Sequence, residues 1–259
     1  MELSKEQSKS YLKLLINIFQ FLATSSEYRR NAYDSIETIQ TALSKLKAIS
    51  ATQCEDWNFS LTPNIEFEIS TKSFCGPRGK THLVIGGQLN VEKGLLKDQS
   101  ITVCVVSTAE SELDEEQKKK HCCGTWNTSL RTVVRRFHFD LDPGQLRRDR
   151  PPIHLQYGGK FDSCHLASGF DYNYELFQAI DLPRLPSPPY DFILLLDMLL
   201  KQFGVNVSGI TQESRWRSLV RCSETLWLLP YFQKITDYLG SADRVNSVYE
   251  QLCEPISIT

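Results

Sequence analysis

A short pattern that occurs twice in this chain constrains its fold more than any other feature. The segment Ile65–Ile69 aligns without gaps with Phe137–Leu141, at an offset of 72 residues (137 − 65). In both segments apolar residues alternate with polar ones, which is typical of a strand with one buried face. Each is followed by His-Leu-x-x-Gly-Gly, which begins at His82 and at His154. A hairpin that occurs twice in one sheet would produce this pattern, and so would chance similarity between two amphipathic hairpins.

Further alternating segments extend the predicted sheet, and apolar periodicity predicts helices on its N-terminal side. Apolar residues at three- and four-residue spacing predict a first helix over 4–24, and Ser4 with Gln7 fits a capping box at its start. The same periodicity predicts a second helix from Ser26 to Ile49, so that the two form a hairpin. We expect strands at the following positions: 65–70, 81–91, 101–107, 133–141 and 153–157.

The C-terminal third of the sequence is predicted to be helical. Tyr190–Phe203 is apolar on nearly every face, which indicates a buried central helix. Pro230 and Gly240 interrupt the pattern that follows, so three further helices are expected, over Thr211–Leu229, Tyr231–Leu239 and Ala242–Leu252. The prediction is a single α+β domain over 1–259, divided as follows: a helical hairpin over 1–52, an antiparallel sheet of about five strands over 58–160 with an inserted helix at 111–123, and a loop and helical part over 161–259.

Charge and targeting signals narrow the class of protein. The chain has 29 Lys+Arg and 31 Asp+Glu, a net charge of −2, which argues against coating nucleic acid by bulk charge. No signal-peptide pattern follows the N-terminus, and the apolar run Phe192–Leu200 is too short to span a bilayer. We therefore expect a cytoplasmic protein that does not enter a membrane. Eight cysteines without a CxxC motif indicate free thiols.

One strand face carries residues that are suited to chemistry. Arg136, His138 and Asp140 alternate along one predicted strand, and His154 and Gln156 share a face of the next. If these strands pair antiparallel, His154 comes within reach of His138 or Asp140. A His–carboxylate–His group suits general acid–base catalysis or part of a metal site. The outer, solvated face of an antiparallel sheet would show the same alternation without any chemistry.

Motifs for metals and cofactors are weak in this sequence. His121-Cys122-Cys123 and Cys164-His165 lack the two- to four-residue spacing of structural zinc ligands. Cys122 beside His121 is an equally weak nucleophile, because geometry and not sequence adjacency makes a catalytic pair. The chain has neither GxGxxG nor GxxxxGK[ST]. We therefore predict no metal and no cofactor.

A local basic stretch interrupts the slightly acidic chain. From Arg131 to Lys160 there are seven Lys and Arg against three Asp. Three of these arginines lie in one four-residue stretch, Arg147–Arg150, which is expected to be an exposed turn. Exposed arginines beside Tyr157 suit phosphates and stacked bases. They suit an acidic protein surface equally well. An ordinary basic loop that binds neither nucleic acid nor a protein would show the same residues. The candidate residues for binding nucleic acid or a partner are Arg136, Arg147, Arg148, Arg150 and Tyr157.

The segment from about 135 to 204, a quarter of the chain, resembles a known group of proteins. It contains Arg136-Phe137-His138-Phe139-Asp140, then Pro152-Ile153-His154-Leu155, then a proline-marked apolar helix from Pro188 to Phe203. This order is similar to that of uncharacterised bacterial proteins found near restriction, phage-defence and toxin–antitoxin genes. Gln156 stands where such proteins carry a second histidine. The resemblance implies a defence or toxin context, without supplying a reaction.

Three functions follow as expectations. The first is a component of a prokaryotic defence or toxin-type system that binds a protein partner encoded nearby, and nucleic acid as a second ligand, without catalysis. The second is a nuclease-like toxin that uses His138, Asp140 and His154. The third is a purely structural subunit of a larger complex.

Overall fold

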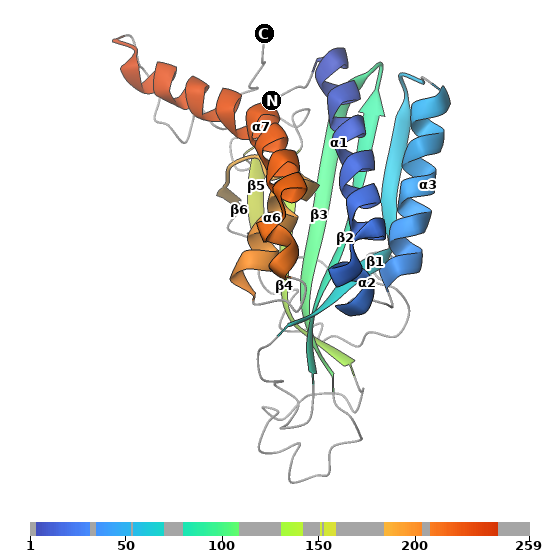
Figure 1. Cartoon of the computed structure of the whole chain (residues 1–259). Coiled ribbons are helices and arrows are strands. Elements are labelled where there is room, and N and C mark those ends of the chain that lie inside the picture. Colours follow the sequence, from blue (N-terminus) through green and yellow to red (C-terminus); the bar gives the residue numbers. More distant parts are fainter. Residues whose placement is uncertain are drawn as a thin grey trace.

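One antiparallel sheet organises the chain, and its six strands lie side by side in sequence order (Figure 1). The computed structural model describes the following residues: 4–31, 35–52, 54–69, 80–108, 131–141, 151, 153–158, 184–203 and 208–242. The strands are β1 (Trp57–Ile69), β2 (Lys80–Glu92), β3 (Leu95–Thr108), β4 (Arg131–Leu141), β5 (Ile153–Tyr157) and β6 (Arg184–Pro186). The predicted α+β class, with helices flanking an antiparallel sheet, is confirmed.

All five expected strands are present, and the differences lie at their ends. β1 begins eight residues before the expected start (65 − 57). Its first part was not predicted because a bulge between Leu61 and Ile65 interrupts the alternation of polar and apolar residues. β6 was not expected, since three residues ending in Pro186 show no alternation. A two-residue turn with positive φ at Lys93 and Gly94 joins β2 to β3. The predicted helix 111–123 lies outside the described residues, and the single-domain assignment stays a prediction.

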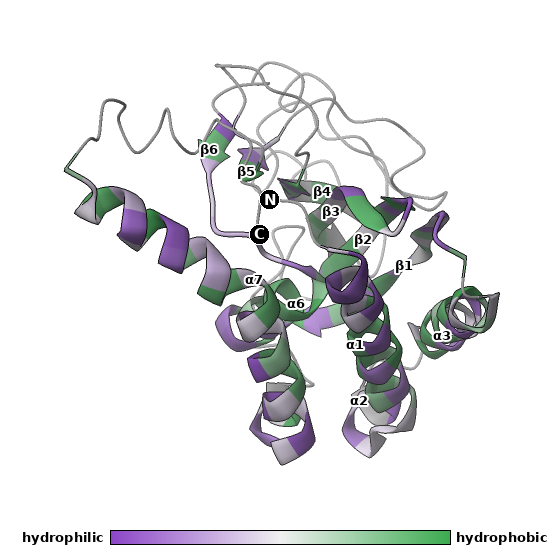
Figure 2. Ribbon diagram, turned by 90° about the horizontal axis from the view of Figure 1, so that it is seen from above, coloured by the Kyte–Doolittle hydropathy of each residue, from purple (hydrophilic) through white to green (hydrophobic). Residues whose placement is uncertain are grey.

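The helices pack on one face of the sheet (Figures 1 and 2). Their bounds are α1 (Lys5–Thr24), α2 (Ser26–Asn31), α3 (Ile36–Thr52), α6 (Phe192–Gln202), the 3₁₀ helix η3 (Ser208–Gln212) and α7 (Ser214–Gly240). The predicted capping box at the start of α1 is confirmed: Ser4 Oγ accepts from Gln7 N at 3.2 Å, and Gln7 Oε1 accepts from Ser4 N at 2.8 Å. No helix in the described part of the chain is both long enough and apolar enough to cross a membrane.

Two helix predictions are wrong in their boundaries. The second helix, expected from Ser26 to Ile49, is divided into α2 and α3. The break expected at Pro230 does not occur, because α7 runs continuously through that residue. A proline inside a helix costs one backbone hydrogen bond and crowds the preceding turn. Trp227 and Tyr231 on either side are both buried, and this packing keeps the helix continuous.

The repeated sequence pattern forms two hairpins with the same register. In β1–β2 Glu68 lies opposite His82, and in β4–β5 Asp140 lies opposite His154. The remaining pairs of the two hairpins correspond in the same way, at the offset of 72 residues seen in the sequence. The two hairpins lie on either side of β3 in one sheet. A hairpin that occurs twice in one sheet, the first of the two interpretations, is therefore what the structure contains.

A buried carboxylate joins α6 to α7 on the helix-covered face of the sheet. Asp191 caps α6: one carboxylate oxygen accepts from Leu194 N at 2.8 Å, and the other accepts from the Ser223 hydroxyl at 2.6 Å. Burial raises the pKa of Asp191 to about 6, and these hydrogen bonds only partly oppose the rise. Asp197 adds a second link by accepting from Trp216 Nε1 at 2.8 Å. The predicted central helix is therefore buried as expected, and it is held by polar as well as apolar contacts.

Candidate functional site: a buried polar network on the sheet

The polar residues singled out in the sequence meet on the sheet face that points away from the helices. Arg136, His138 and Asp140 alternate along β4, so their side chains share this face. Asp140 lies opposite Ser100 of β3 on one side and His154 of β5 on the other. Three neighbouring strands therefore contribute to one cluster, as the antiparallel pairing of β4 and β5 predicted.

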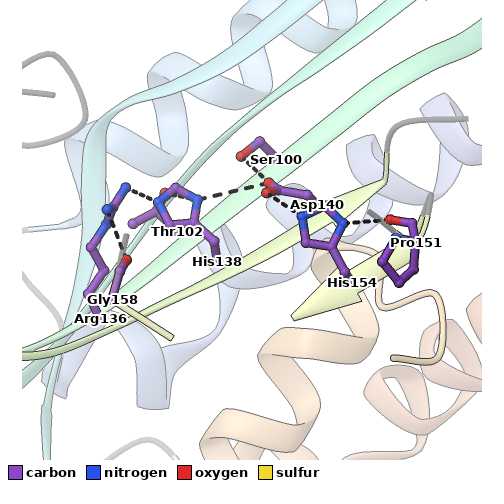
Figure 3. Close-up of polar contacts among 8 residues, drawn as sticks. All are labelled: Ser100, Thr102, Arg136, His138, Asp140, Pro151, His154 and Gly158. Carbon is purple, nitrogen blue, oxygen red and sulfur yellow. Dashed lines mark hydrogen bonds and ion pairs between the residues drawn. The ribbon is translucent and has the colours of Figure 1, made fainter. Parts of the chain in front are cut away.

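Asp140 is the centre of the cluster (Figure 3). The Ser100 hydroxyl donates to Asp140 Oδ1 at 2.6 Å, His154 Nε2 lies 3.4 Å from Oδ2, and His138 Nδ1 lies 3.9 Å from Oδ1. Burial by itself raises the pKa of Asp140, but His154, His138 and Ser100 together outweigh it and lower the pKa to about 2. Asp140 is therefore an ionised carboxylate at neutral pH.

His154 is completely buried and has one well-defined hydrogen bond. Its Nδ1 lies 2.8 Å from the carbonyl oxygen of Pro151. A carbonyl oxygen can only accept, so Nδ1 carries a proton. Nε2 faces Asp140 Oδ2 at 3.4 Å without forming a hydrogen bond to it, and it forms none with any other group. One edge of the ring is thus fixed by the backbone, and the other is aimed at the carboxylate.

Arg136 and His138 extend the cluster along β4. Arg136 is only 1% exposed, and its guanidinium donates to the Gly158 carbonyl oxygen at 3.1 Å and contacts His138 Nε2. A guanidinium can only donate, so His138 Nε2 accepts and the ring proton lies on Nδ1, which faces Thr102 Oγ1 at 3.4 Å. Arg136 was expected at a binding surface; the structure places it inside, where it supports the network.

Burial distinguishes this cluster from the solvated sheet face that was the alternative interpretation. His138 is 8% exposed, and Thr102 and Gln156 are buried beside it. Polar groups removed from water are costly unless they are hydrogen-bonded, which explains why these side chains contact one another. The interpretation of this face as a solvated outer surface is therefore wrong.

A small cavity lies near the C-terminal end of β4. Its volume is about 10 Å³, room for roughly one water molecule. Asp140 contributes to its wall, together with the following residues: Gln99, Phe139, Leu141, Ile153, Ser187, Pro188, Pro189, Tyr190 and Trp227. Neither histidine lines it. This cavity has space for a solvent molecule and not for a substrate.

A second set of residues lies on the opposite face, at the β4–β5–β6 edge. Tyr157 is 43% exposed, its hydroxyl accepts from Arg135 Nη1 at 2.7 Å, and its ring packs edge-on against Phe137. Leu185 of β6, 51% exposed, extends this surface. We call these four residues the Arg135–Tyr157 surface. Tyr157 was expected at a binding surface, whereas Arg135 was expected only as part of the basic stretch. The position of Arg135 two residues before Phe137 places both on one strand face, as strand alternation predicts.

Three predicted binding residues, Arg147, Arg148 and Arg150, lie outside the described residues, as do Cys122 and its neighbours. Within the described part of the chain, no group of three or more His, Cys, Asp or Glu side chains is arranged to hold a metal ion. The comparisons with known proteins identify no family, since no family model, curated protein or solved structure matches this chain.

Proposed function

We propose that this chain is a binding protein without catalysis of its own, a cytoplasmic component of a prokaryotic phage-defence or toxin-type system. It engages a protein partner, with nucleic acid as a second ligand class. The defence or toxin context rests on the resemblance of residues 135–204 to proteins encoded near such systems. The binding role rests on the way the described site residues are used.

The observation that carries the proposal is the burial of His138 and His154, the two candidate catalytic histidines. His154 is 0% exposed and its Nδ1 is engaged by a backbone carbonyl, while His138 Nε2 faces Arg136. A general acid or base has to come within hydrogen-bonding distance of a substrate proton. Side chains that are enclosed and held by contacts within the chain are better suited to stabilising a sheet than to reaching a substrate.

The Arg135–Tyr157 surface supplies the accessible contact. Among the described side chains on this face of β4, β5 and β6, Arg135 provides a cation and no carboxylate is present. Exposed Tyr157 and Leu185 add apolar area beside the charge. Tyr and Arg are enriched in protein interfaces, and an unopposed cation favours an acidic partner. An acidic protein surface is therefore the proposed partner.

Co-purification of the tagged chain from its native host tests this role. Arg135→Glu and Tyr157→Ala should each remove the partner, because one reverses the charge and the other removes the exposed ring. Arg217→Glu, a charge reversal at an exposed position of α7, is the matched control and should retain the partner. Retention by all three variants, each with a wild-type melting temperature, would contradict the proposed surface.

A nuclease-like toxin is the second candidate, and one observation favours it. His154 Nε2 is a buried nitrogen without a hydrogen bond, aimed at an ionised carboxylate 3.4 Å away. Such an arrangement is suited to holding a proton between two groups. The test is cleavage of single-stranded and duplex nucleic acid by the wild type, by His154→Gln and by His82→Gln as control. Cleavage that only His154→Gln abolishes would favour the enzyme over the binding protein.

A further inference from the structure

The C-terminal half of α7 carries an apolar stripe that no described element covers. Leu229, Phe232 and Leu239 are 61%, 50% and 49% exposed, and they are three of the five exposed large hydrophobic residues in the described part of the chain. The end of this helix extends beyond the sheet (Figures 1 and 2). Large apolar side chains gathered on one projecting element mark an interaction site.

The spacing of the stripe is that of a helix–helix seam. Leu229, Phe232, Thr236 and Leu239 follow one another at intervals of three, four and three residues, the a/d pattern of a heptad. All four are exposed. Tyr231, which lies outside this stripe on the same helix, is buried. The helix therefore has one face against the body of the molecule and one apolar face directed outward.

The polar groups beside the stripe are already satisfied within the helix. The Thr236 hydroxyl donates to the Phe232 carbonyl oxygen at 2.9 Å, so this residue can present its methyl group to a partner without leaving an unpaired polar atom. Gln233 Nε2 donates to Asp237 Oδ1 at 2.8 Å on the adjacent side. Burial of the stripe would therefore break none of these hydrogen bonds.

We propose that this stripe pairs with the same stripe of a second copy of the chain, with the two helices antiparallel. In that orientation Leu229 of one copy faces Leu239 of the other, and Phe232 faces Thr236. The two inner layers then join the large Phe232 ring to the smaller Thr236, and the two outer layers join leucine to leucine, which gives the seam its complementarity. A parallel pair would instead place two Phe232 rings against each other and two Thr236 side chains opposite one another.

Charge supports a second copy as the occupant. The flanking positions Leu228, Gln233 and Ile235 carry no charge, and neither does the seam itself. Two identical copies therefore meet without like-charge repulsion, which commonly prevents self-pairing of helices. A seam of four residues is short, so the dimer is weak, with a dissociation constant in the micromolar range.

Sedimentation velocity over a range of protein concentrations tests the dimer. The wild type should pass from monomer to dimer with rising concentration, and Phe232→Glu should weaken the dimer about 10-fold or more. Thr236→Lys, which places a charge in the seam at an exposed position, is a second variant if Phe232→Glu fails to fold. Ser218→Glu, exposed on the first half of α7, is the control and should dimerise as the wild type does.

Cysteine cross-linking tests the orientation. With the native cysteines other than buried Cys104 replaced by serine, a mixture of Leu229→Cys and Leu239→Cys should form disulfide-linked heterodimers, while neither variant alone should cross-link efficiently. Cross-linking of each variant with itself would indicate a parallel pair and overturn the antiparallel arrangement. A monomeric wild type at every concentration, or a dimer that Phe232→Glu and Thr236→Lys both leave intact, would overturn the proposal itself.

Discussion

The two hairpins formed by the repeated sequence share a register and differ in what surrounds their polar residues. In β1–β2 His82 Nδ1 lies 2.9 Å from Glu66 Oε1, with side chains that are 17% and 27% exposed. In β4–β5 His154 Nε2 lies 3.4 Å from Asp140 Oδ2, with side chains that are 0% and 14% exposed. The more exposed pair is the shorter one, and the buried pair belongs to a network that also includes Arg136, His138 and Ser100.

This difference shows that the alternating pattern places a histidine near a carboxylate without determining what the pair does. A surface pair exchanges hydration for a modest Coulomb attraction and contributes little to stability. A buried pair loses its hydration, so each member depends on the others to compensate for that loss. The pattern is therefore the same in the two hairpins, while the free energy at stake is much larger in the second.

The largest expected effect comes from removing the central carboxylate of the buried network. Asp140→Ala leaves His138 and His154 without the carboxylate that they face, which should lower the free energy of unfolding by about 3 kcal/mol or more. Glu66→Ala removes the carboxylate that pairs with His82 in the more exposed hairpin and should cost about 0.5 kcal/mol. Urea unfolding of the two variants measures both values. Equal losses would break the comparison between the hairpins.

The next effect appears when the wild type is titrated with acid. The pKa of Asp140 in the folded chain, about 2, lies below its ordinary value of 3.8, so Asp140 stabilises the fold above about pH 4. That contribution is lost as the pH falls towards 2, and it amounts to about 2 kcal/mol. Asp140→Asn should remove this part of the pH dependence, whereas Glu66→Gln should retain it.

The pKa of Asp191 is shifted in the opposite direction from that of Asp140, so the two residues affect stability in different pH ranges. The pKa of Asp191 in the folded chain, about 6, lies above the ordinary 3.8, so its contribution is fully present below about pH 4 and is lost as the pH rises through 6. Asp191→Asn should remove the decline between pH 4 and 6 and leave the acid-side loss unchanged. A wild-type profile that is flat below pH 4 would contradict the role assigned to Asp140.

The sequence predicted those parts of the fold and site that depend on local patterns. Strict alternation places His138 and Asp140 on one face, and antiparallel pairing then brings His154 opposite Asp140; both relations follow from strand geometry. The capping box at Ser4 is equally local. These predictions are confirmed because they involve neighbours along one strand, one hairpin or one helical turn.

Other features depend on packing that no local pattern contains. Alternation cannot show whether a polar face is covered, so the burial of Arg136 was missed and a surface role was expected for it. Pro230 is a helix-breaking signal that the burial of Trp227 and Tyr231 overrides. The contact of Arg135 with the Tyr157 hydroxyl requires side-chain positions on two strands. Each of these depends on tertiary contacts.

A smaller difference is expected between the two histidines themselves. His154→Gln removes a fully buried ring whose Nδ1 donates to the Pro151 carbonyl oxygen, and it should cost about 1–3 kcal/mol. His82→Gln changes a partly exposed ring and should cost about 0.5 kcal/mol. Thermal melts at pH 7 measure the order of the two. A larger loss in His82→Gln would mean that burial is not what distinguishes the hairpins.

The smallest effect concerns the glycine that both copies of the pattern place at the same position, Gly86 and Gly158. Gly158 has a φ of +79°, in the left-handed region, and its carbonyl accepts from Arg136. Gly158→Ala should therefore cost about 1–2 kcal/mol, because a Cβ disfavours this backbone conformation. In Gly86→Ala the new Cβ would meet the side-chain end of Asn64, at 2.2 Å from its Oδ1, which can rotate away. Gly86→Ala should therefore cost less than Gly158→Ala, and urea unfolding of the two variants measures both costs. A larger loss in Gly86→Ala would mean that the backbone at the end of β5, whose carbonyl accepts from Arg136, does not require glycine.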